Sequence, residues 1–198
     1  NDDHKYTKDN ETYKFDLNKS FKKFNLGISH MKGLRNPTLY ELFGTDNFGY
    51  SGNRNLNPEI SYSNEIYTNI NFNSNLKLSS RLFTSNIKEN IEYVNNQYVN
   101  DTDNIDLNQS GLNSEIAYST NLVNFKIYSS FLSSKKENQA DQLRRPEKNY
   151  GISLSKKFSN KLIGDYIFNL NYNHYGKHFD THSSNFSTIE MDSTDLVD

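Results

Sequence analysis

Apolar and polar residues alternate along most of this chain, which is the pattern of β-strands with one apolar and one polar face. The alternation predicts nine strands, and the ninth has the weakest pattern. Their apolar positions are Tyr13, Phe15 and Leu17; Phe24, Leu26 and Ile28; Ile60, Tyr62, Ile66, Ile70 and Phe72; Leu76, Leu78 and Leu82; Leu112, Ile116 and Tyr118; Val123, Phe125, Ile127 and Phe131; Tyr150, Ile152 and Leu154; Tyr166, Phe168, Leu170 and Tyr172; and Ile189 and Met191.

The connections between these strands alternate between short and long. We expect tight polar turns at 21–23, 73–75, 120–122 and 159–161, and long loops at 33–59, 95–104, 133–148 and 175–187. This rhythm is typical of an all-β, antiparallel up-and-down transmembrane β-barrel, with short turns on one side of the membrane and long loops on the other. Hairpins begin about every 44–48 residues, a period that propeller blades also show, but each repeat here holds two long strands rather than four short ones.

Charged residues within the strands occupy the phase opposite to the apolar series. They are Lys14, Asp16, Glu65, Lys77, Arg81, Glu115, Lys126 and Asp165. A lipid-facing Lys or Arg at mid-membrane costs roughly 2–4 kcal/mol, so membrane barrels exclude charge from one phase. A soluble all-β sandwich also alternates and remains the alternative. The lengths of the predicted strands favour a membrane barrel over a soluble sandwich. Segments 60–72 and 162–174 are about 13 residues long, whereas strands of soluble proteins average about 5–6 residues and membrane-spanning strands need about 9–11.

Composition excludes several classes of function. The chain has 198 residues with a formal net charge of −2, which gives no basic field for nucleic acid. It has no Cys, so thiol nucleophiles, disulfides and Cys-based metal sites are excluded. No apolar run is long enough for a transmembrane helix. We find no Gly-rich phosphate loop, no Ser-centred elbow and no paired carboxylates, and we therefore expect no enzyme activity and no cofactor.

Nine strands are too few for a finished bacterial barrel, which has an even number, and an open sheet edge would be unsatisfied in lipid. The chain begins at Asn1 without an initiator Met or a signal peptide, and it ends at Asp198 without the terminal aromatic residue of such barrels. We therefore expect 1–198 to be an internal, C-terminal portion of a larger barrel.

The first long loop contains an ordered turn. Thr38 and Glu41 are spaced as a capping box for one short helical turn. Leu39, Leu42 and Phe43 are expected to pack this turn down, and Gly44 to end it.

Four segments resemble TonB-dependent outer-membrane receptors. LRNPTLYELFG at 34–44 and GNRNLNPE at 52–59 are similar to the family's "fkAPtLyeLfg … GNpnLkPE". LFTSNIKENIEY at 82–93 is similar to "lfyndikdlIey", and LRRP at 143–146 to "LlRRPkh". Their order and spacing match over roughly 12–198, and they are most similar to the C-terminal portion of the vitamin B12 (cobalamin) receptor branch.

The resemblance implies a 22-stranded barrel with an N-terminal plug, of which this chain supplies about nine strands. It implies capture of cobalamin outside the cell and import driven by the TonB complex, which acts through the plug region absent from this chain. A ferric-siderophore receptor is the main alternative, and a plug-free pore or adhesin is a further one. The expected surroundings are the lipid bilayer and lipopolysaccharide of the bacterial outer membrane.

Candidate ligand-binding residues come from the loops. Arg144 and Arg145 lie where a long loop enters a strand, and strand alternation would let at most one of them point into the lumen. The guanidinium group is suited to phosphate or carboxamide oxygens. Tyr40, Tyr50 and Tyr98 are expected to stack on a flat ligand.

Two patterns invite a metal site, and we predict none at either. His174, His178 and His182 recur every four residues, but they leave a strand and enter a loop, where this helical spacing has no meaning. Asp101, Asp103 and Asp106 lack the Gly and the Glu of an EF-hand calcium loop.

Overall fold

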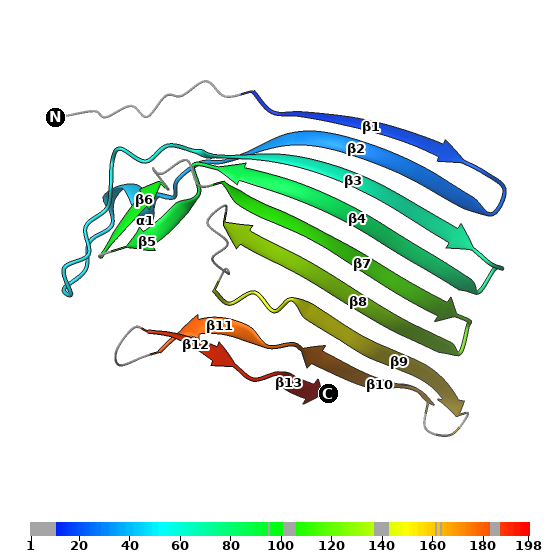
Figure 1. The fold of residues 1–198 in the computed structure, drawn as a ribbon. Coiled ribbons are helices and arrows are strands. Elements are labelled where there is room, and N and C mark those ends of the chain that lie inside the picture. Colours follow the sequence, from blue (N-terminus) through cyan, green and yellow to red (C-terminus); the bar gives the residue numbers. More distant parts are fainter. Residues whose placement is uncertain are drawn as a thin grey trace.

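The computed structural model describes residues 11–94, 96–100, 106–136, 143–160, 162, 164–182 and 187–198. In these residues nine strands form one antiparallel sheet, here called the main sheet, in which strands close in sequence lie side by side (Figure 1). The strands in order are β1 (Tyr13–Ser20), β2 (Phe24–Arg35), β3 (Glu59–Asn71), β4 (Leu76–Lys88), β7 (Leu107–Ser119), β8 (Val123–Lys136), β9 (Lys148–Asn160), β10 (Gly164–Tyr175) and β13 (Thr194–Val197).

Smaller elements lie at the end of the main sheet where the long loops are, here called the loop end (Figure 1). They are helix α1 (Leu39–Phe43), the hairpin β5 (Ile91–Val94) with β6 (Gln97–Asn100), and the hairpin β11 (His178–Thr181) with β12 (Thr188–Met191). We predicted loops where β6 and β11 lie, because strands of four residues are too short for a two-residue period to be recognised. Among the described residues, no helix has the length and apolar character required to cross a membrane.

The predicted up-and-down order is confirmed for eight strands, and the ninth prediction is wrong. Ile189 and Met191 lie in β12, which pairs with β11 rather than with the main sheet. The ninth strand of the main sheet is β13, which pairs with Tyr172–Tyr175 of β10. Its apolar residues Leu196 and Val197 are adjacent rather than alternating, so the periodicity could not reveal it.

Three of the predicted tight turns are found between the predicted strands, and the fourth lies further along the chain. We expected a turn at 159–161, but β9 continues to Asn160 and β10 begins at Gly164. Asp165 explains the extension: it pairs with Ser159 in register, accepts a hydrogen bond from the Ser159 hydroxyl at 2.5 Å and forms an ion pair with Lys157 at 3.0 Å.

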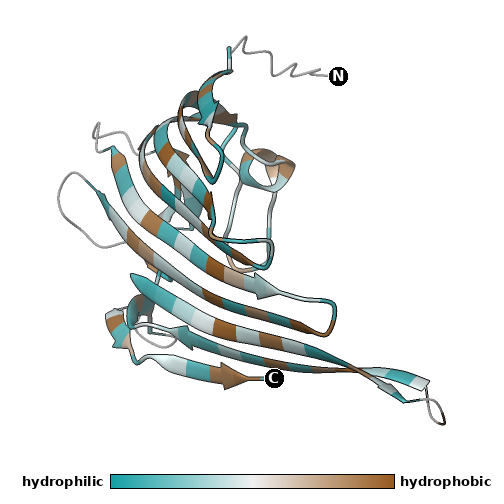
Figure 2. Cartoon of the chain, turned by 90° about the vertical axis from the view of Figure 1, so that its right-hand side faces the viewer, coloured by the Kyte–Doolittle hydropathy of each residue, from teal (hydrophilic) through white to brown (hydrophobic). Residues whose placement is uncertain are grey.

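One face of the main sheet, here called the apolar face, carries exposed apolar side chains in continuous rows. Residues paired in register share a face, so a row can be followed from strand to strand. One row consists of Leu17, Ile28, Ile66, Leu82, Leu112 and Phe131, whose exposed fractions range from 37% to 71%. Figure 2 shows the resulting bands of hydrophobic and hydrophilic residues along the strands. A large apolar surface of this kind is typical of a protein–protein or membrane contact.

The opposite face, here called the polar face, is linked by hydrogen bonds and ion pairs between strands. All eight charged residues predicted to oppose the apolar series lie on it. The Arg81 guanidinium contacts the Glu65 carboxylate at 2.5 Å, and the Tyr67 hydroxyl donates to Asp16 at 2.9 Å. The predicted placement of these eight charged residues opposite the apolar series is therefore confirmed.

Three glycines on the polar face lie beneath aromatic rings of the paired strand. The register pairs are Gly27 with Tyr67, Gly111 with Phe83, and Gly151 with Tyr128. A Cβ atom on Gly111 would lie 2.7 Å from the Phe83 ring and 2.6 Å from the Phe131 carbonyl oxygen. These positions therefore require glycine, because a Cβ atom would overlap the neighbouring ring. Each ring in turn covers the backbone of the glycine with which it is paired.

The most buried apolar cluster lies outside the main sheet. Leu42 of α1, Leu56 of the first long loop and Ile91 of β5 form this cluster, and Tyr98 packs against it. Leu56 is only 1% exposed. The long loops thus hold a small hydrophobic core of their own, which fixes their position at the loop end.

We predict that Gly111→Val lowers the free energy of unfolding by about 1–3 kcal/mol, the usual cost of overpacking. The valine side chain would overlap the Phe83 ring and the Phe131 carbonyl oxygen, which belongs to the backbone of β8 and cannot move aside. The measurement is urea unfolding, in detergent micelles, of the full-length protein that contains this chain. Ser110→Val, on the exposed apolar face, is the matched control and should change little. Equal midpoints for the two variants would contradict the packing described.

Candidate functional site

The guanidinium of Arg35 holds three segments together at the loop end. Its Nε and Nη2 donate to the two carboxylate oxygens of Glu59 at 2.6 and 3.0 Å, and its Nη1 donates to Glu41 of α1 at 3.1 Å. The same Glu59 carboxylate accepts the backbone N–H of Ile91 in β5 at 2.8 Å. Arg35 and Glu59 are register partners in the polar-face phase. The loops are therefore anchored on the polar-face side of the main sheet.

The predicted capping box of α1 is confirmed. The Glu41 N–H donates to the Thr38 hydroxyl at 3.2 Å, and the Thr38 N–H donates to the Glu41 carboxylate at 2.6 Å. Gly44 ends the helix with an extended backbone, and its N–H donates to the Tyr40 carbonyl. Leu42 is buried as predicted, but the predicted packing of Leu39 and Phe43 is wrong, since both are exposed. A helix of five residues has one anchored side, and Glu41 and Leu42 occupy it.

The β5–β6 hairpin is fixed to the first long loop by Asn100. Its side-chain oxygen accepts the Asn57 N–H at 2.6 Å, and its amide donates to the carbonyls of Asn57 and Glu89 at 3.0 and 2.8 Å. The hairpin is also tied to β8, because Lys136 forms an ion pair with Glu92 at 2.5 Å. We call residues 36–58, 89–94 and 96–100 together the loop platform.

Four tyrosines of the loop platform form one cluster, and three of them are predicted site residues. Tyr40 and Tyr50 stack with ring centroids 4.8 Å apart. Tyr98 meets Tyr50 edge-on at 5.8 Å, and Tyr93 lies 5.1 Å from Tyr98. Tyr50 is only 3% exposed and donates its hydroxyl to the Tyr40 carbonyl at 2.6 Å, whereas Tyr40 and Tyr93 are about half exposed. The cluster therefore has a buried centre and an exposed aromatic rim.

The surroundings of Glu41 and Tyr50 favour the protonation state in which each group makes its hydrogen bonds: Glu41 as a carboxylate and Tyr50 as a neutral hydroxyl. Burial opposes ionisation of Glu41, but the hydrogen bond from the Thr38 N–H and the Arg35 guanidinium outweigh it, so the pKa of Glu41 lies below its ordinary value. Burial raises the pKa of Tyr50, so its hydroxyl remains a neutral donor. The contact of Arg35 with Glu41 is therefore present at neutral and at mildly acidic pH.

Arg144 and Arg145 lie before β9 rather than within it, so strand alternation does not decide their orientation as we predicted. Arg144 has a left-handed backbone with φ of 59°, and its backbone N–H donates to the Phe179 carbonyl. Its Nε donates to Asp180 of β11 at 2.7 Å. Arg145 makes no such bond to any residue in the described part of the chain. It lines a pocket of about 280 Å³ together with Lys177 and His178.

The expectation of no metal site stays untested, although the described residues hold no cluster of three or more His, Asp or Glu placed for a metal ion. His174 lies in β10, where it stacks on Tyr150 with ring centroids 4.4 Å apart and contacts Asp195 through Nδ1 at 2.7 Å. Asp106 accepts a hydrogen bond from Asn86 at 2.9 Å. Asp101 and Asp103 lie outside the described residues.

The structure brings Tyr40, Tyr50 and Tyr98 together and places Arg144 and Arg145 in another group, beside the β11–β12 hairpin. Arg35 and Glu59, which hold α1 and β5 in place beneath the tyrosines, were not among the predicted site residues. The available signal was that these two opposite charges flank the first long loop, where antiparallel pairing puts them opposite each other.

No family model matches the chain, and no curated protein sequence matches it. Several solved structures, however, match its fold. The iron transporter FrpB of Neisseria meningitidis (F3-3 variant) matches with a TM-score of 0.67 and 13% identity over 94% of this chain. The ferric yersiniabactin uptake receptor FyuA of Yersinia pestis matches with a TM-score of 0.66 and 13% identity over 93%. The siderophore receptor PirA of Acinetobacter baumannii matches with a TM-score of 0.67 and 13% identity over 93%.

This chain spans 31%, 28% and 33% of those three chains. Each is named as a transporter or a receptor and none as an enzyme. At 13% identity the similarity concerns the fold, which agrees with the nine-stranded antiparallel sheet. The predicted fold class is confirmed: the chain is all-β and antiparallel, and it has the fold of a portion of these transporters and receptors.

We predict that Arg35→Met releases the loop platform. It leaves the Glu41 and Glu59 carboxylates without their partner, and a hydrogen bond to a charged group contributes about 1.5–3 kcal/mol. Because the Arg35 side chain is 42% exposed, we expect the lower end of that range, which corresponds to about tenfold faster cleavage within the platform. Limited proteolysis of the full-length protein, with cleavage sites mapped by mass spectrometry, measures this. Arg81→Met breaks a comparable pair within the sheet and should leave platform cleavage unchanged; similar cleavage for both variants would contradict the anchoring role.

Proposed function

We propose that residues 1–198 are the C-terminal barrel portion of a TonB-dependent outer-membrane receptor that captures a scarce metal chelate for import into the periplasm. The observation that carries this proposal is the main sheet, with exposed apolar rows on one face and linked charges on the other. The fold similarity to iron and siderophore receptors and the sequence motifs support the same assignment. The plug, and the contact with the TonB complex through it, belong to the rest of the receptor.

In this proposal the apolar face contacts the lipids of the bacterial outer membrane and the polar face lines the lumen. Strands of 12–14 residues, β2 to β4 and β7 to β10, are long enough for the crossing. The short turns then lie on the periplasmic side and the loop platform on the outer side. Because the platform is anchored on the polar-face side, it lies over the entrance to the lumen.

The ligand surface in this proposal is the tyrosine rim of the platform, with Arg145 as a second contact. Tyr40 and Tyr93 offer aromatic faces to a flat or ring-shaped ligand, and Tyr50 and Tyr98 hold them in place. The Arg145 guanidinium is suited to carboxamide or phosphate oxygens. Arg144, engaged with Asp180, positions the β11–β12 hairpin beside the Arg145 pocket.

Cobalamin is the ligand that the sequence resemblance favours, because the motifs are most similar to the cobalamin branch. A ferric siderophore is the second candidate, and the fold matches favour it, since FyuA is named for ferric yersiniabactin and PirA for siderophores. The two ligands are both large metal chelates, and the same aromatic rim suits either.

The test is equilibrium binding of cyanocobalamin and of ferric siderophores to the full-length receptor refolded in detergent. We expect submicromolar binding of one chelate class, and Tyr40→Ala should weaken it by about two- to tenfold, since an aromatic contact contributes about 0.5–1.5 kcal/mol. Phe48→Ala removes an exposed ring outside the cluster and is the matched control. Binding of neither class by a folded receptor would overturn the proposal, and siderophore binding without cobalamin binding would overturn the cobalamin assignment alone.

A further inference from the structure

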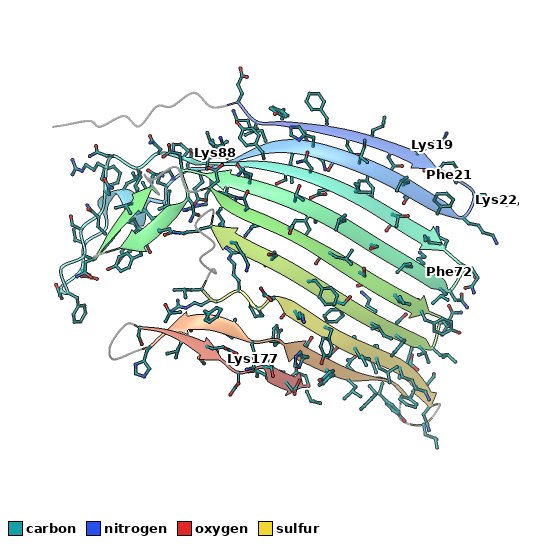
Figure 3. All side chains as sticks on the ribbon, in the orientation of Figure 1. Lys19, Phe21, Lys22, Phe72, Lys88 and Lys177 are labelled. Atoms are coloured by element: carbon teal, nitrogen blue, oxygen red, sulfur yellow. The ribbon has the colours of Figure 1, made fainter. Side chains whose placement is uncertain are left out.

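The pocket beside the β11–β12 hairpin contains charged groups of both signs. Its volume is about 280 Å³, and β8, the turn before β9 and the hairpin segment supply its lining. The lining residues with hydrogen-bonding side chains include Ser134, Arg145, Glu147, Lys177 and Glu190. Figure 3 shows Lys177 where β10 leads into the hairpin.

The pocket lies on the polar-face side of the loop end, next to the loop platform. Ser134 of β8 pairs with Gln109 in the polar-face phase of the main sheet. Lys136, two residues further along the same face of β8, forms the ion pair with Glu92 that ties the platform to this strand. The pocket and the platform therefore adjoin at the end of β8, on the side where the proposed function places the lumen.

The turn that carries Arg145 and Glu147 is fixed at both ends. The bond of the Arg144 N–H joins it to β11, and the Glu147 carbonyl accepts the Leu132 N–H of β8 at 2.8 Å. Pro146 favours an extended backbone at the residue before it. The Cα atoms of Arg145 and Glu147 are then at most roughly 7 Å apart. Both side chains thus line the pocket from one fixed wall.

Arg145 and Glu147 have opposite charges and are not used by the chain. Neither side chain forms an ion pair or a hydrogen bond with any residue that the structure describes. By contrast, Lys177 of the same pocket forms an ion pair with Glu190 at 2.7 Å. A guanidinium supplies only donors and a carboxylate only acceptors, so the wall offers a ligand one site of each kind.

Two further groups in the pocket have unused hydrogen-bonding capacity. Ser134 is only 8% exposed, and its oxygen accepts the Gln109 amide at 3.0 Å, but within the described ranges its O–H donates to no acceptor. One carboxylate oxygen of Glu190 accepts from Lys177, and the other has no partner in that part of the chain. A buried donor without an acceptor is costly, and a ligand acceptor in the pocket would remove this cost.

The charges of the lining cancel when His178 is neutral, since Arg145 and Lys177 balance Glu147 and Glu190. A net anion would be attracted by the two cations and repelled by the two carboxylates, and a net cation would meet the reverse. A group with one positive and one negative charge satisfies both. The volume of about 280 Å³ is just below the range of about 300–1,000 Å³ typical of ligand pockets, so one end group fits rather than a whole chelate.

We propose that this pocket binds a zwitterionic α-amino-acid group at the end of the captured chelate. The carboxylate of that group accepts hydrogen bonds from the Arg145 guanidinium and the Ser134 hydroxyl. Its ammonium donates to the carboxylates of Glu147 and Glu190. This inference rests on the proposed function, because it takes the ligand to be a chelate held over the lumen. It favours a ferric siderophore with such an end group over cobalamin, which carries none.

The first experiment measures the binding of three fragments to the full-length receptor in micelles by saturation-transfer NMR. The fragments are L-alanine, N-acetyl-L-alanine, which lacks the ammonium, and L-alaninamide, which lacks the carboxylate. We expect L-alanine to bind about tenfold more tightly than either analogue, because each analogue loses one charged contact. Equal binding of L-alanine and either analogue would overturn the inference.

Two variants assign the contacts. Arg145→Gln should weaken binding of L-alanine and N-acetyl-L-alanine about tenfold and leave L-alaninamide unchanged. Glu147→Gln should weaken L-alanine and L-alaninamide and leave N-acetyl-L-alanine unchanged. Arg54→Gln, at an exposed arginine outside the pocket, is the matched control and should change none of the three. Loss of all three fragments alike in either pocket variant would show a merely structural role and would contradict the assigned contacts.

A second experiment connects the pocket to a chelate. It compares ferric complexes of desferrioxamine B whose terminal amine is acetylated, succinylated or joined to the γ-carboxyl group of glutamate. The γ-glutamyl complex alone has an α-amino-acid end, so we expect it to bind at least about tenfold more tightly than the other two. Arg145→Gln should abolish this difference. Equal binding of the three complexes beside a clear preference for L-alanine would show a site for free amino acids and would overturn the assignment to the chelate.

Binding of cyanocobalamin and of ferric siderophores to the same preparations tests the proposed function separately. A receptor that binds one of these chelates but does not prefer L-alanine retains the proposed function and loses only this inference. A receptor that prefers L-alanine but binds no chelate retains the amino-acid site and loses both the proposed function and the link to a chelate.

Discussion

One continuous register through the main sheet is the constraint on which the rest of the structure depends. Because side chains alternate with a period of two, a slip of one residue in any strand would move its charged residues to the apolar face. The pairs of Arg81 with Glu65 and of Tyr67 with Asp16 form only in this register. The glycines beneath aromatic rings, such as Gly27 under Tyr67, reinforce it, since a shifted strand would place a side chain where the ring lies.

The register of the main sheet also determines the position of the loop platform. Arg35 and Glu59 face each other because β2 and β3 pair through their whole length, and together they hold α1 and β5. The small core of Leu42, Leu56 and Ile91 and the ion pair of Lys136 with Glu92 then fix the platform across several strands. The tyrosine rim is thus held at the loop end through a few charged contacts, and its geometry depends on the register of the strands that carry it.

The features that could be predicted from the sequence are those that depend on the two-residue period of its apolar and polar residues. Long alternating strands, tight turns and the placement of eight charged residues opposite the apolar series follow from a period of two, and the Thr38–Glu41 capping box follows from a local motif. What it did not predict comes from tertiary contacts. β11 and β13 are too short to show a period, and in β13 Leu196 next to Val197 breaks it. Arg144 and Arg145 looked like strand residues, but the bond of Arg144 to Asp180 places them in a separate turn. The contact of Arg35 with Glu59 joins residues 24 positions apart, and its sequence signal is only that two opposite charges flank the first long loop.

Adjacent residues of β8 test most directly whether the apolar face meets lipid while the polar face meets the lumen. Ile127 lies on the apolar face and Lys126 on the polar face. In a full-length receptor without other cysteines, Ile127→Cys and Lys126→Cys would each carry a nitroxide label in vesicles. Collision rates with oxygen and with a water-soluble paramagnet are then measured. We expect the label at 127 to meet oxygen and not the water-soluble reagent, and the label at 126 to show the reverse. Equal access of the water-soluble reagent to both positions would show that the two faces of the sheet do not meet different surroundings.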